Sequence, residues 1–263
     1  MRGIKIIGGL CMTVLLLSGC HAQLSENHQI IDHSNGENIK KEKYTGEYVE
    51  MTPEQKALIL KVSVTPKDVE QGKLANWERK LLRQYDYALE VLHQKYPSYE
   101  FYIVGASPKR ISDVYATFDF KEQGSEDVIY TLYVYEEEDD VYSATDNFYA
   151  SIITQPMEDA MKTLLLDEGI PCDDVDIDIS TTEGEAFNEA MKIEDIMTGK
   201  ITMTQLTRIY IKQGDLLNED YESLFNTIKQ LIETNKIAGG YSVIIYEDNN
   251  KQDIYKNYFS VFV

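Results

Sequence analysis

Apolar residues recur along this chain at spacings that predict first helices and then strands. The clearest helix precedes Pro97, where one apolar stripe has members three or four positions apart: Leu74, Trp77, Leu81, Tyr85, Ala88 and Leu92. Pro97 would end this helix. A shorter helix is predicted to begin after Thr52, because Thr52, Pro53 and Gln55 match a capping box with proline at the first helical position. Thr65 and Pro66 repeat this start signal.

The period then changes to two, which predicts strands at 99–105, 113–121 and 128–135. In the second of these, one face carries Val114, Ala116, Phe118 and Phe120, and the other carries Tyr115, Thr117, Asp119 and Lys121. Closely spaced strands favour an antiparallel meander.

The rest of the chain alternates between the two periods. We expect a helix from Gln155 to Glu168 with Pro156 at its start, and a helix opened by a second capping box at Thr182 and running to Met197. Strands at 174–180 and 205–212, a helix from Asn218 to Lys236, and a hairpin of 240–247 and 253–262 complete the set. This order predicts an α+β fold with a largely antiparallel sheet covered by helices. A helix followed by a hairpin occurs near both ends, which is compatible with two similar halves.

The N-terminus carries an export signal. Arg2 and Lys5 are its only charges, and the apolar run from Ile6 to Leu17 is shorter than the about 20 residues that span a bilayer. Leu17, Ser18, Gly19 and Cys20 follow, and this ending resembles the lipobox of bacterial lipoproteins. The alternative is a core cysteine that happens to follow a leucine-rich helix.

The resemblance implies a diacylglyceryl group on the Cys20 thiol and cleavage between Gly19 and Cys20. Residues 1–19 would then be the signal peptide, and lipid on Cys20 would hold the protein on the extracytoplasmic face of the cell membrane. Two acyl chains suit stable anchoring, because one chain alone gives marginal, reversible binding. Residues 20–51 are polar and predict a lipidated N-terminus followed by a flexible tether, and 52–263 predict the extracytoplasmic α+β domain. The acidic, tyrosine-rich body resembles uncharacterised lipoproteins of Gram-positive bacteria.

Net charge and cysteine count exclude some partners and any internal disulfide in the mature chain. The chain has a net charge of −20, which lacks the basic footprint that nucleic-acid binding needs and opposes electrostatic attachment to anionic lipids. Cleavage would remove Cys11, and lipidation would occupy Cys20. Cys172 would then be alone, so the mature chain could form no internal disulfide.

Residues suited to catalysis are few. His93 is the one histidine in the predicted domain, on the long helix next to Gln94 and Lys95, where a surface residue is the usual outcome. Cys172 precedes Asp173 and Asp174, whose charge opposes formation of a reactive thiolate. Carboxylates are abundant, and a hydrolase could use two that face each other. The candidates are Asp113, Asp119, Asp174, Asp176 and Asp178.

Two acidic stretches have their own interpretations. The run 136–140 lies between two predicted strands and is expected to be a solvated loop. Asp174, Asp176 and Asp178 would share one face of a strand. They favour an exposed edge that repels other strands, with a Ca²⁺ site as the alternative, although Ile179 stands where an EF-hand loop needs glycine. No other cofactor is indicated.

Tyrosines gather in the middle of the chain, and the sequence contains 19 in all. Tyrosine suits half-buried strands, but exposed rings can also anchor a partner. The cluster comprises Tyr130, Tyr133, Tyr135, Tyr142 and Tyr149.

The sequence therefore predicts a membrane-anchored binding or interaction module, with a surface or envelope protein as the expected kind of partner and no catalytic constellation. The alternative is a carboxylate-dependent hydrolase of cell-wall or extracellular polymer. A solute-binding lipoprotein ranks lower, because the body is short for two wrapped lobes and lacks a regular βαβ alternation.

Overall fold

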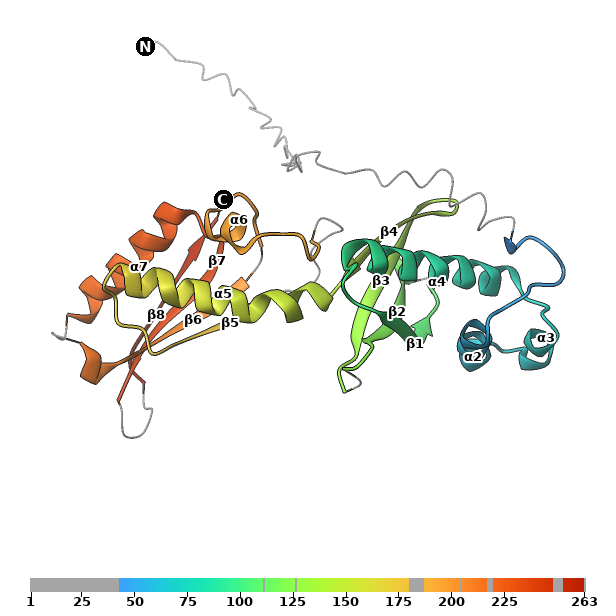
Figure 1. Ribbon diagram of the computed structural model, residues 1–263, viewed down its shortest axis with the longest axis horizontal. Coiled ribbons are helices and arrows are strands. Elements are labelled where there is room, and N and C mark those ends of the chain that lie inside the picture. The colour runs from blue at the N-terminus through green and yellow to red at the C-terminus, as the bar shows by residue number, and fades with distance from the viewer. Residues whose placement is uncertain are drawn as a thin grey trace, which may run out of the picture. The chain divides into compact units, whose positions relative to one another are not determined.

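The computed structural model describes residues 43–110, 112–125, 127–179, 187–203, 205–216, 220–247 and 253–262. Within them the chain forms an α+β fold with two four-stranded sheets, ordered β1-β2-β3-β4 and β5-β6-β7-β8 (Figure 1). The predicted fold class is confirmed, with two sheets where one was expected. None of the described helices is long and apolar enough to cross a bilayer. The lipobox and residues 21–42 lie outside the described residues.

The first sheet is the expected antiparallel meander. Its strands are β1 (Phe101–Ser107), β2 (Tyr115–Glu122), β3 (Tyr130–Glu138) and β4 (Val141–Asp146), each paired antiparallel with the next. Three helices precede it: α2 (Pro53–Val62), α3 (Pro66–Glu70) and α4 (Asn76–Lys95). The capping box at Thr52 is formed, with Thr52 Oγ1 accepting from Gln55 N at 3.2 Å.

Helix α4 buries its apolar stripe on one face of this sheet and contacts all four strands. Alternation along β2 turns Ala116, Phe118 and Phe120 toward the helix, and all three are fully buried. Burying one such phenylalanine contributes about 1.5–3 kcal/mol, so the alternation that predicted the strand also fixes which face carries the core.

Order begins earlier than Thr52. Tyr44 and Val49 are buried in the core, and Tyr44 Oη donates to Asp86 Oδ2 at 2.8 Å. Val49 N donates to Gly72 O at 2.8 Å. The expected tether boundary is therefore wrong for 44–49. Two apolar residues without a period gave no signal that Asp86 of α4 would bond Tyr44 and that Gly72 would bond Val49.

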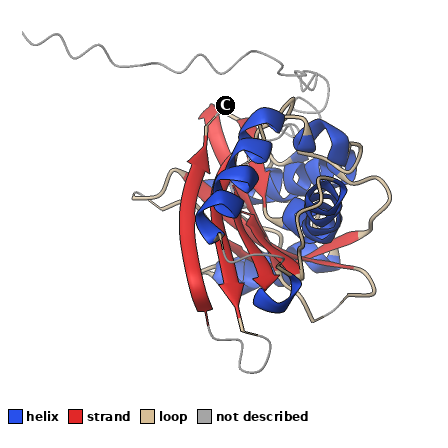
Figure 2. Cartoon of the chain, turned by 90° about the vertical axis from the view of Figure 1, so that its left-hand side faces the viewer, coloured by secondary structure: helices blue, strands red, loops and turns tan. Residues whose placement is uncertain are grey.

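The second sheet mixes antiparallel and parallel pairs. Its strands are β5 (Asp174–Ile179), β6 (Gln205–Lys212), β7 (Gly239–Tyr246) and β8 (Asp253–Val261). The β6–β7 pair is parallel and the outer pairs are antiparallel. The helices are α5 (Phe148–Asp167), α6 (Ile193–Met197) and α7 (Tyr221–Asn235), with a 3₁₀ turn at Gln213–Asp215. Helix α7 provides the crossover that a parallel pair requires. Figure 2 shows helices on one side of these strands.

Two predicted helices differ from the structure. Helix α5 begins at Phe148, so Pro156 lies in its interior although proline favours the first turn. Burial of Phe148 and Tyr149 at the added N-terminal turn offsets this cost. The helix expected from Thr182 to Met197 is wrong between 187 and 192, where Ala190 lies in a turn, and 180–186 lie outside the described residues. The two sheets also differ in their connections, although α4-β1-β2 and α7-β7-β8 are both a helix followed by a hairpin.

Candidate functional site

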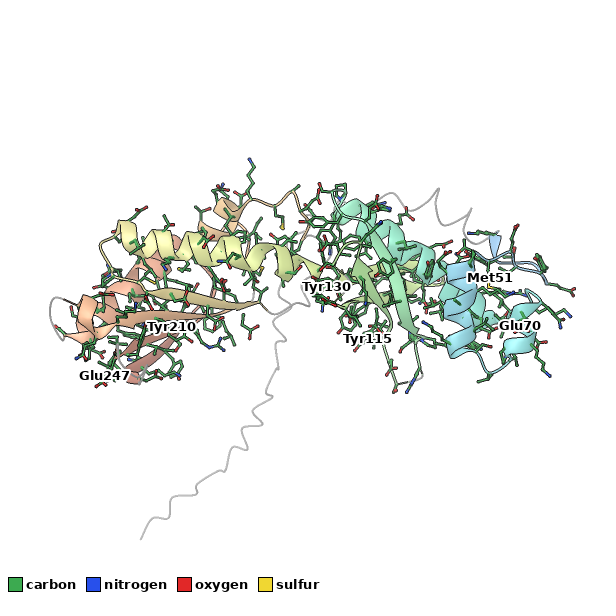
Figure 3. All side chains as sticks on the ribbon, turned by 60° about the horizontal axis from the view of Figure 1, so that its bottom comes forward. Met51, Glu70, Tyr115, Tyr130, Tyr210 and Glu247 are labelled. Atoms are coloured by element: carbon green, nitrogen blue, oxygen red, sulfur yellow. The ribbon has the colours of Figure 1, made fainter. Side chains whose placement is uncertain are left out.

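The face of the first sheet turned away from α4 is the surface best suited to binding. Alternation on β2, β3 and β4 places aromatic and hydroxyl side chains there, and all of them are half-buried rather than covered. We call this the tyrosine face; it comprises Tyr115, Thr117, Asp119, Thr131, Tyr133, Tyr135, Ser143 and Thr145. Figure 3 labels Tyr115 on β2.

Strand register brings three of its rings together. Tyr115 lies opposite Tyr135, and Thr117 lies opposite Tyr133 on the neighbouring strand. The Tyr115 ring centroid is 5.0 Å from that of Tyr133 at 79°, and 5.4 Å from that of Tyr135 at 73°. Such edge-to-face pairs contribute about 0.5–1.5 kcal/mol each beyond their buried area. The cluster is therefore held in place before any partner arrives.

The hydroxyls of this cluster are available. Among the described residues, the side-chain hydroxyls of Tyr115, Tyr133 and Tyr135 make no hydrogen bond. The buried tyrosines differ: Tyr96 Oη donates to Asp146 Oδ1 at 2.8 Å, and Tyr241 Oη donates to Ile237 O at 2.8 Å. A tyrosine with a packed ring and a free hydroxyl is suited to contact a partner.

The other end of the face is polar and closely fitted. Thr131 Oγ1 lies 3.3 Å from Asp119 Oδ1, and Thr131 N donates to Asn147 Oδ1 at 2.8 Å. Gly105 lies opposite Asp119 beside a bulge in β1, and a Cβ at Gly105 would come within 3.0 Å of Asp119 Oδ2. The carboxylate of Asp119 thus occupies space that a side chain at position 105 would fill.

The predicted tyrosine cluster divides between this face and the core. Tyr133 and Tyr135 lie on the tyrosine face, whereas Tyr130, Tyr142 and Tyr149 are buried. Burial raises the pKa of Tyr149 to about 12. Tyr115 was missed as a member, although the alternation of 113–121 already placed it with Thr117 and Asp119.

The acidic run 136–140 is only partly solvated. Glu136 pairs with Lys80 of α4 and lies 3.8 Å from Lys109 Nζ. Asp140 is buried, accepts from Arg83 Nε at 2.7 Å and from Tyr142 Oη at 2.9 Å. The expected solvated loop is therefore wrong for these two residues, because α4 supplies cations that local sequence cannot reveal.

The three aspartates of β5 do not form a metal centre. They alternate with buried Val175, Ile177 and Ile179 as predicted, so they share one face of an edge strand. Side chains two residues apart on a strand are about 6.5 Å apart, whereas each oxygen ligand of Ca²⁺ must lie about 2.3–2.6 Å from the ion. Asp176 Oδ2 instead accepts from Arg208 Nη1 at 2.8 Å. Among the described residues, no three His, Cys, Asp or Glu side chains are grouped as a metal site would need.

The expected hydrolase carboxylates are not paired either. Asp113 and Asp119 are six positions apart along nearly extended chain, on the order of 20 Å, whereas glycosidase carboxyls lie about 5–9.5 Å apart. Asp174, Asp176 and Asp178 belong to the other sheet. No geometry for paired-carboxylate chemistry follows from these five residues.

The remaining reactive groups are inert by position. His93 is exposed on α4. Burial raises the pKa of the half-buried Cys172 thiol to about 11, and its Sγ lies 3.5 Å from Asp174 O. The thiol is therefore protonated at neutral pH and is a poor nucleophile.

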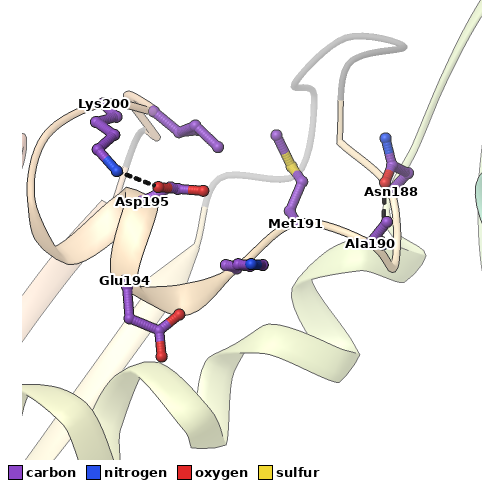
Figure 4. Close-up of a pocket in the computed structure, with 8 residues that line it drawn as sticks. Asn188, Ala190, Met191, Glu194, Asp195 and Lys200 are labelled. Carbon is purple, nitrogen blue, oxygen red and sulfur yellow. Dashed lines mark hydrogen bonds and ion pairs between the residues drawn. The ribbon is translucent and has the colours of Figure 1, made fainter.

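Hollows occur on the surface of the second half. One lies beside α6, where Lys200 Nζ and Asp195 Oδ1 are 2.8 Å apart and Met191 stands to the side of them (Figure 4). Another lies at the end of α5, lined by Leu166, Ile170 and Leu216. Both are open to solvent and neither assembles a nucleophile with a base, so the tyrosine face is the better candidate site.

Comparisons with known proteins add little to this geometry. No protein-family model matches the chain, and no curated protein matches it. A crystal structure of a DUF5037 family protein from Ruminococcus gnavus ATCC 29149 is similar over 63% of this chain and 73% of that one, at 12% identity and a TM-score of 0.29. A likeness this weak carries no argument about fold or function.

Proposed function

We propose that this chain is a membrane-anchored lipoprotein whose extracytoplasmic body binds an envelope or surface protein through the tyrosine face. The anchor would be a diacylglyceryl group on Cys20, added before cleavage between Gly19 and Cys20. Its support is the sequence: the basic start, the short apolar run and the four residues that resemble a lipobox.

The observation that carries the binding role is the edge-to-face cluster of Tyr115, Tyr133 and Tyr135 with free hydroxyls. Tyrosine offers a large, rigid and amphipathic contact at a low entropic cost, and serine and threonine add adaptable hydrogen bonds, as in antibody combining sites. The tyrosine face has this composition and is already ordered, which lowers the cost of association.

The hydrolase alternative has less support, because the described carboxylates named for it are not paired and do not line either of the two hollows described above. The buried carboxylates Asp140 and Asp146 are engaged by Arg83 and Lys95. We therefore favour binding over hydrolysis.

The anchor is tested by lipid labelling of the full chain expressed in a bacterium. Cys20→Ala should abolish incorporation of labelled palmitate and block cleavage between positions 19 and 20, because the lipid attachment atom is lost. Cys172→Ala is the matched control and should leave labelling and cleavage unchanged. If Cys20→Ala still incorporates palmitate, or is still cleaved between positions 19 and 20, the anchor is wrong.

The binding face is tested by photo-cross-linking on intact cells. A benzoylphenylalanine at Tyr133 should yield a discrete cross-linked protein band, and the same probe at exposed Leu166 on α5 should not. Tyr115→Ala in the Tyr133 probe chain should reduce the band several-fold, because the supporting ring is lost. Equal bands at both positions, or a band insensitive to Tyr115→Ala, would refute the role of this face.

A further inference from the structure

The edges of the two sheets differ in how they are protected. A sheet edge presents unpaired N–H and C=O groups that can accept another strand. On β1, Lys61 of α2 donates to Val104 O at 3.1 Å, and a bulge interrupts the strand between Ile103 and Gly105. Strand β4 has six residues, which limits what it can pair with. These edges offer little to a partner strand.

Strand β5 is blocked by side chains. Its row of alternating aspartates repels other acidic chains, and Ile177 N donates to Glu158 Oε1 of α5 at 3.0 Å, so an outward N–H group of this strand is bonded to another element. One edge of the second sheet is therefore closed.

Strand β8, at the other edge, is nine residues long and is rich in residues that favour strands. Tyr258 N donates to Oδ1 of its neighbour Asn257 at 2.8 Å. Tyr258 pairs with Ser242 of β7, so this local bond marks it as a residue whose backbone groups face outward. Outward groups alternate along a strand, so Lys256 and Ser260 share this direction. The alternation stops at Ile254, where the register with β7 shifts between Tyr255 and Asp253.

The same strand carries exposed apolar side chains. Tyr255 and Phe259 face α7, where Phe225 lies 5.6 Å from Phe259 by ring centroids. Tyr258 therefore occupies the face away from α7 and is 64% exposed, and Phe262, just beyond the strand, is 92% exposed. Ile254 instead packs against the core. Exposed aromatics beside an open edge are a site where another strand can add.

Charge favours a second copy as the occupant. The chain as a whole carries −20, yet Asp253 and Lys256 are the only charged residues from 253 to 262, so the segment is neutral. Two copies that meet along β8 would bring no acids into opposition. Antiparallel pairing centred on Tyr258 would place the two Tyr258 side chains opposite each other and Lys256 opposite Ser260, so aromatic meets aromatic and the two lysines stay apart. Tyr258 N would exchange its local bond to Asn257 Oδ1 for one to the second copy.

We propose that β8 is a self-association edge, at which two copies of this chain pair antiparallel about a two-fold axis at Tyr258 and join their second sheets into one continuous sheet. A two-fold interface uses the same patch on both copies, as this strand does. The proposal is independent of the tyrosine face and of the lipid anchor.

A cysteine scan tests the pairing and its axis. Single cysteines are placed at Lys256, Tyr258, Ser260 and Phe262 in full-length Cys172→Ser protein and treated on cells with a short bismaleimide. In this pairing the copies of residue 258 meet, those of 256 and of 260 are about 13 Å apart, and those of 262 about 26 Å apart. Dimer yield should peak at 258 and fall on both sides. Leu166→Cys and the parent without added cysteine should give only background.

A second measurement uses the purified full-length protein in detergent. Ser260→Pro removes one outward N–H, which the edge strand does not need for its bonds to β7, so the fold should persist with an unchanged circular dichroism spectrum. The protein mass measured by sedimentation should halve, from dimer to monomer. Leu166→Ser is the control and should leave the dimer intact. A monomeric parent protein, a flat cysteine profile, or cross-links from Tyr258→Cys to a different protein alone would overturn the proposal.

Discussion

The buried ion pair between Lys95 and Asp146 offers the sharpest test of what holds the first half together. Both side chains are almost completely buried, at 5% and 1% exposure. Asp146 Oδ1 also accepts from Tyr96 Oη at 2.8 Å and from Phe148 N at 2.9 Å. One carboxylate thus joins the end of α4 to the start of α5, within a cluster of aromatic rings that includes Phe101.

Asp146→Asn keeps the volume of the side chain and removes its charge, so Lys95 is left buried without a counter-ion. Removing one partner of a buried pair typically costs about 3–5 kcal/mol. Replacing both, with Lys95→Met and Asp146→Asn together, should recover part of this loss, because the uncompensated charge is gone. The two single variants should therefore be non-additive by about 1–3 kcal/mol.

Equilibrium urea unfolding, followed by circular dichroism, measures these free energies. Asp176→Asn is the matched control, because Asp176 pairs with Arg208 at the surface, where their side chains are 49% and 39% exposed. Exposed ion pairs contribute about 0–1 kcal/mol to the free energy of unfolding. If Asp146→Asn costs no more than Asp176→Asn, the buried pair does not stabilise the fold as argued.

Three further predictions follow from other buried contacts. Burial raises the pKa of Tyr96, so the folded chain keeps a proton that the unfolded chain loses near pH 10; stability should fall above about pH 10 by about 1.4 kcal/mol per pH unit for each such tyrosine, and Tyr96→Phe should lessen the slope in urea unfolding. An unchanged slope would contradict this. Tyr44→Phe should cost about 1–3 kcal/mol by the same assay, because Asp86 loses a buried donor; a neutral result would place 44–49 outside the fold. Gly199→Ala should lower the thermal midpoint, because Gly199 has φ +68° and a Cβ would meet Lys236 O at 2.6 Å, and an unchanged midpoint would reject that strain.

Local periodicity predicted the helices and strands because each signal lies within a few residues. The stripe from Leu74 to Leu92 and the alternation around Phe118 became α4 and β2 with shifts of one or two residues at their ends. The order β6-α7-β7 is itself typical of a parallel pair, since a helix between two strands is the usual crossover. The short turns between other strands favoured antiparallel hairpins, so a largely antiparallel sheet was predicted.

Contacts between distant segments could not be predicted in this way. Lys80 and Arg83, which pair with Glu136 and Asp140, come from α4, more than fifty residues earlier, and no residue close to the acids in sequence indicates these pairs. The ring contacts of Tyr115 depend on the register of β2 with β3, which a single strand does not specify. The start of α5 is likewise set by Phe148 in a core built from other elements.

The strong acidity of the chain changes meaning once its distribution is considered. Asp140 and Asp146 are buried and neutralised by cations from α4, so they stabilise the fold rather than repel partners. The two surfaces we propose for association carry few acids: the tyrosine face carries Asp119, Lys121 and Glu137, whose carboxylate accepts from Ser143 Oγ, and β8 is neutral. On a chain of net charge −20, other faces of two approaching copies repel one another over about a Debye length of 8–10 Å, and these surfaces should repel least. If both proposals hold, the acidity would restrict close association to the faces whose aromatic residues can sustain it.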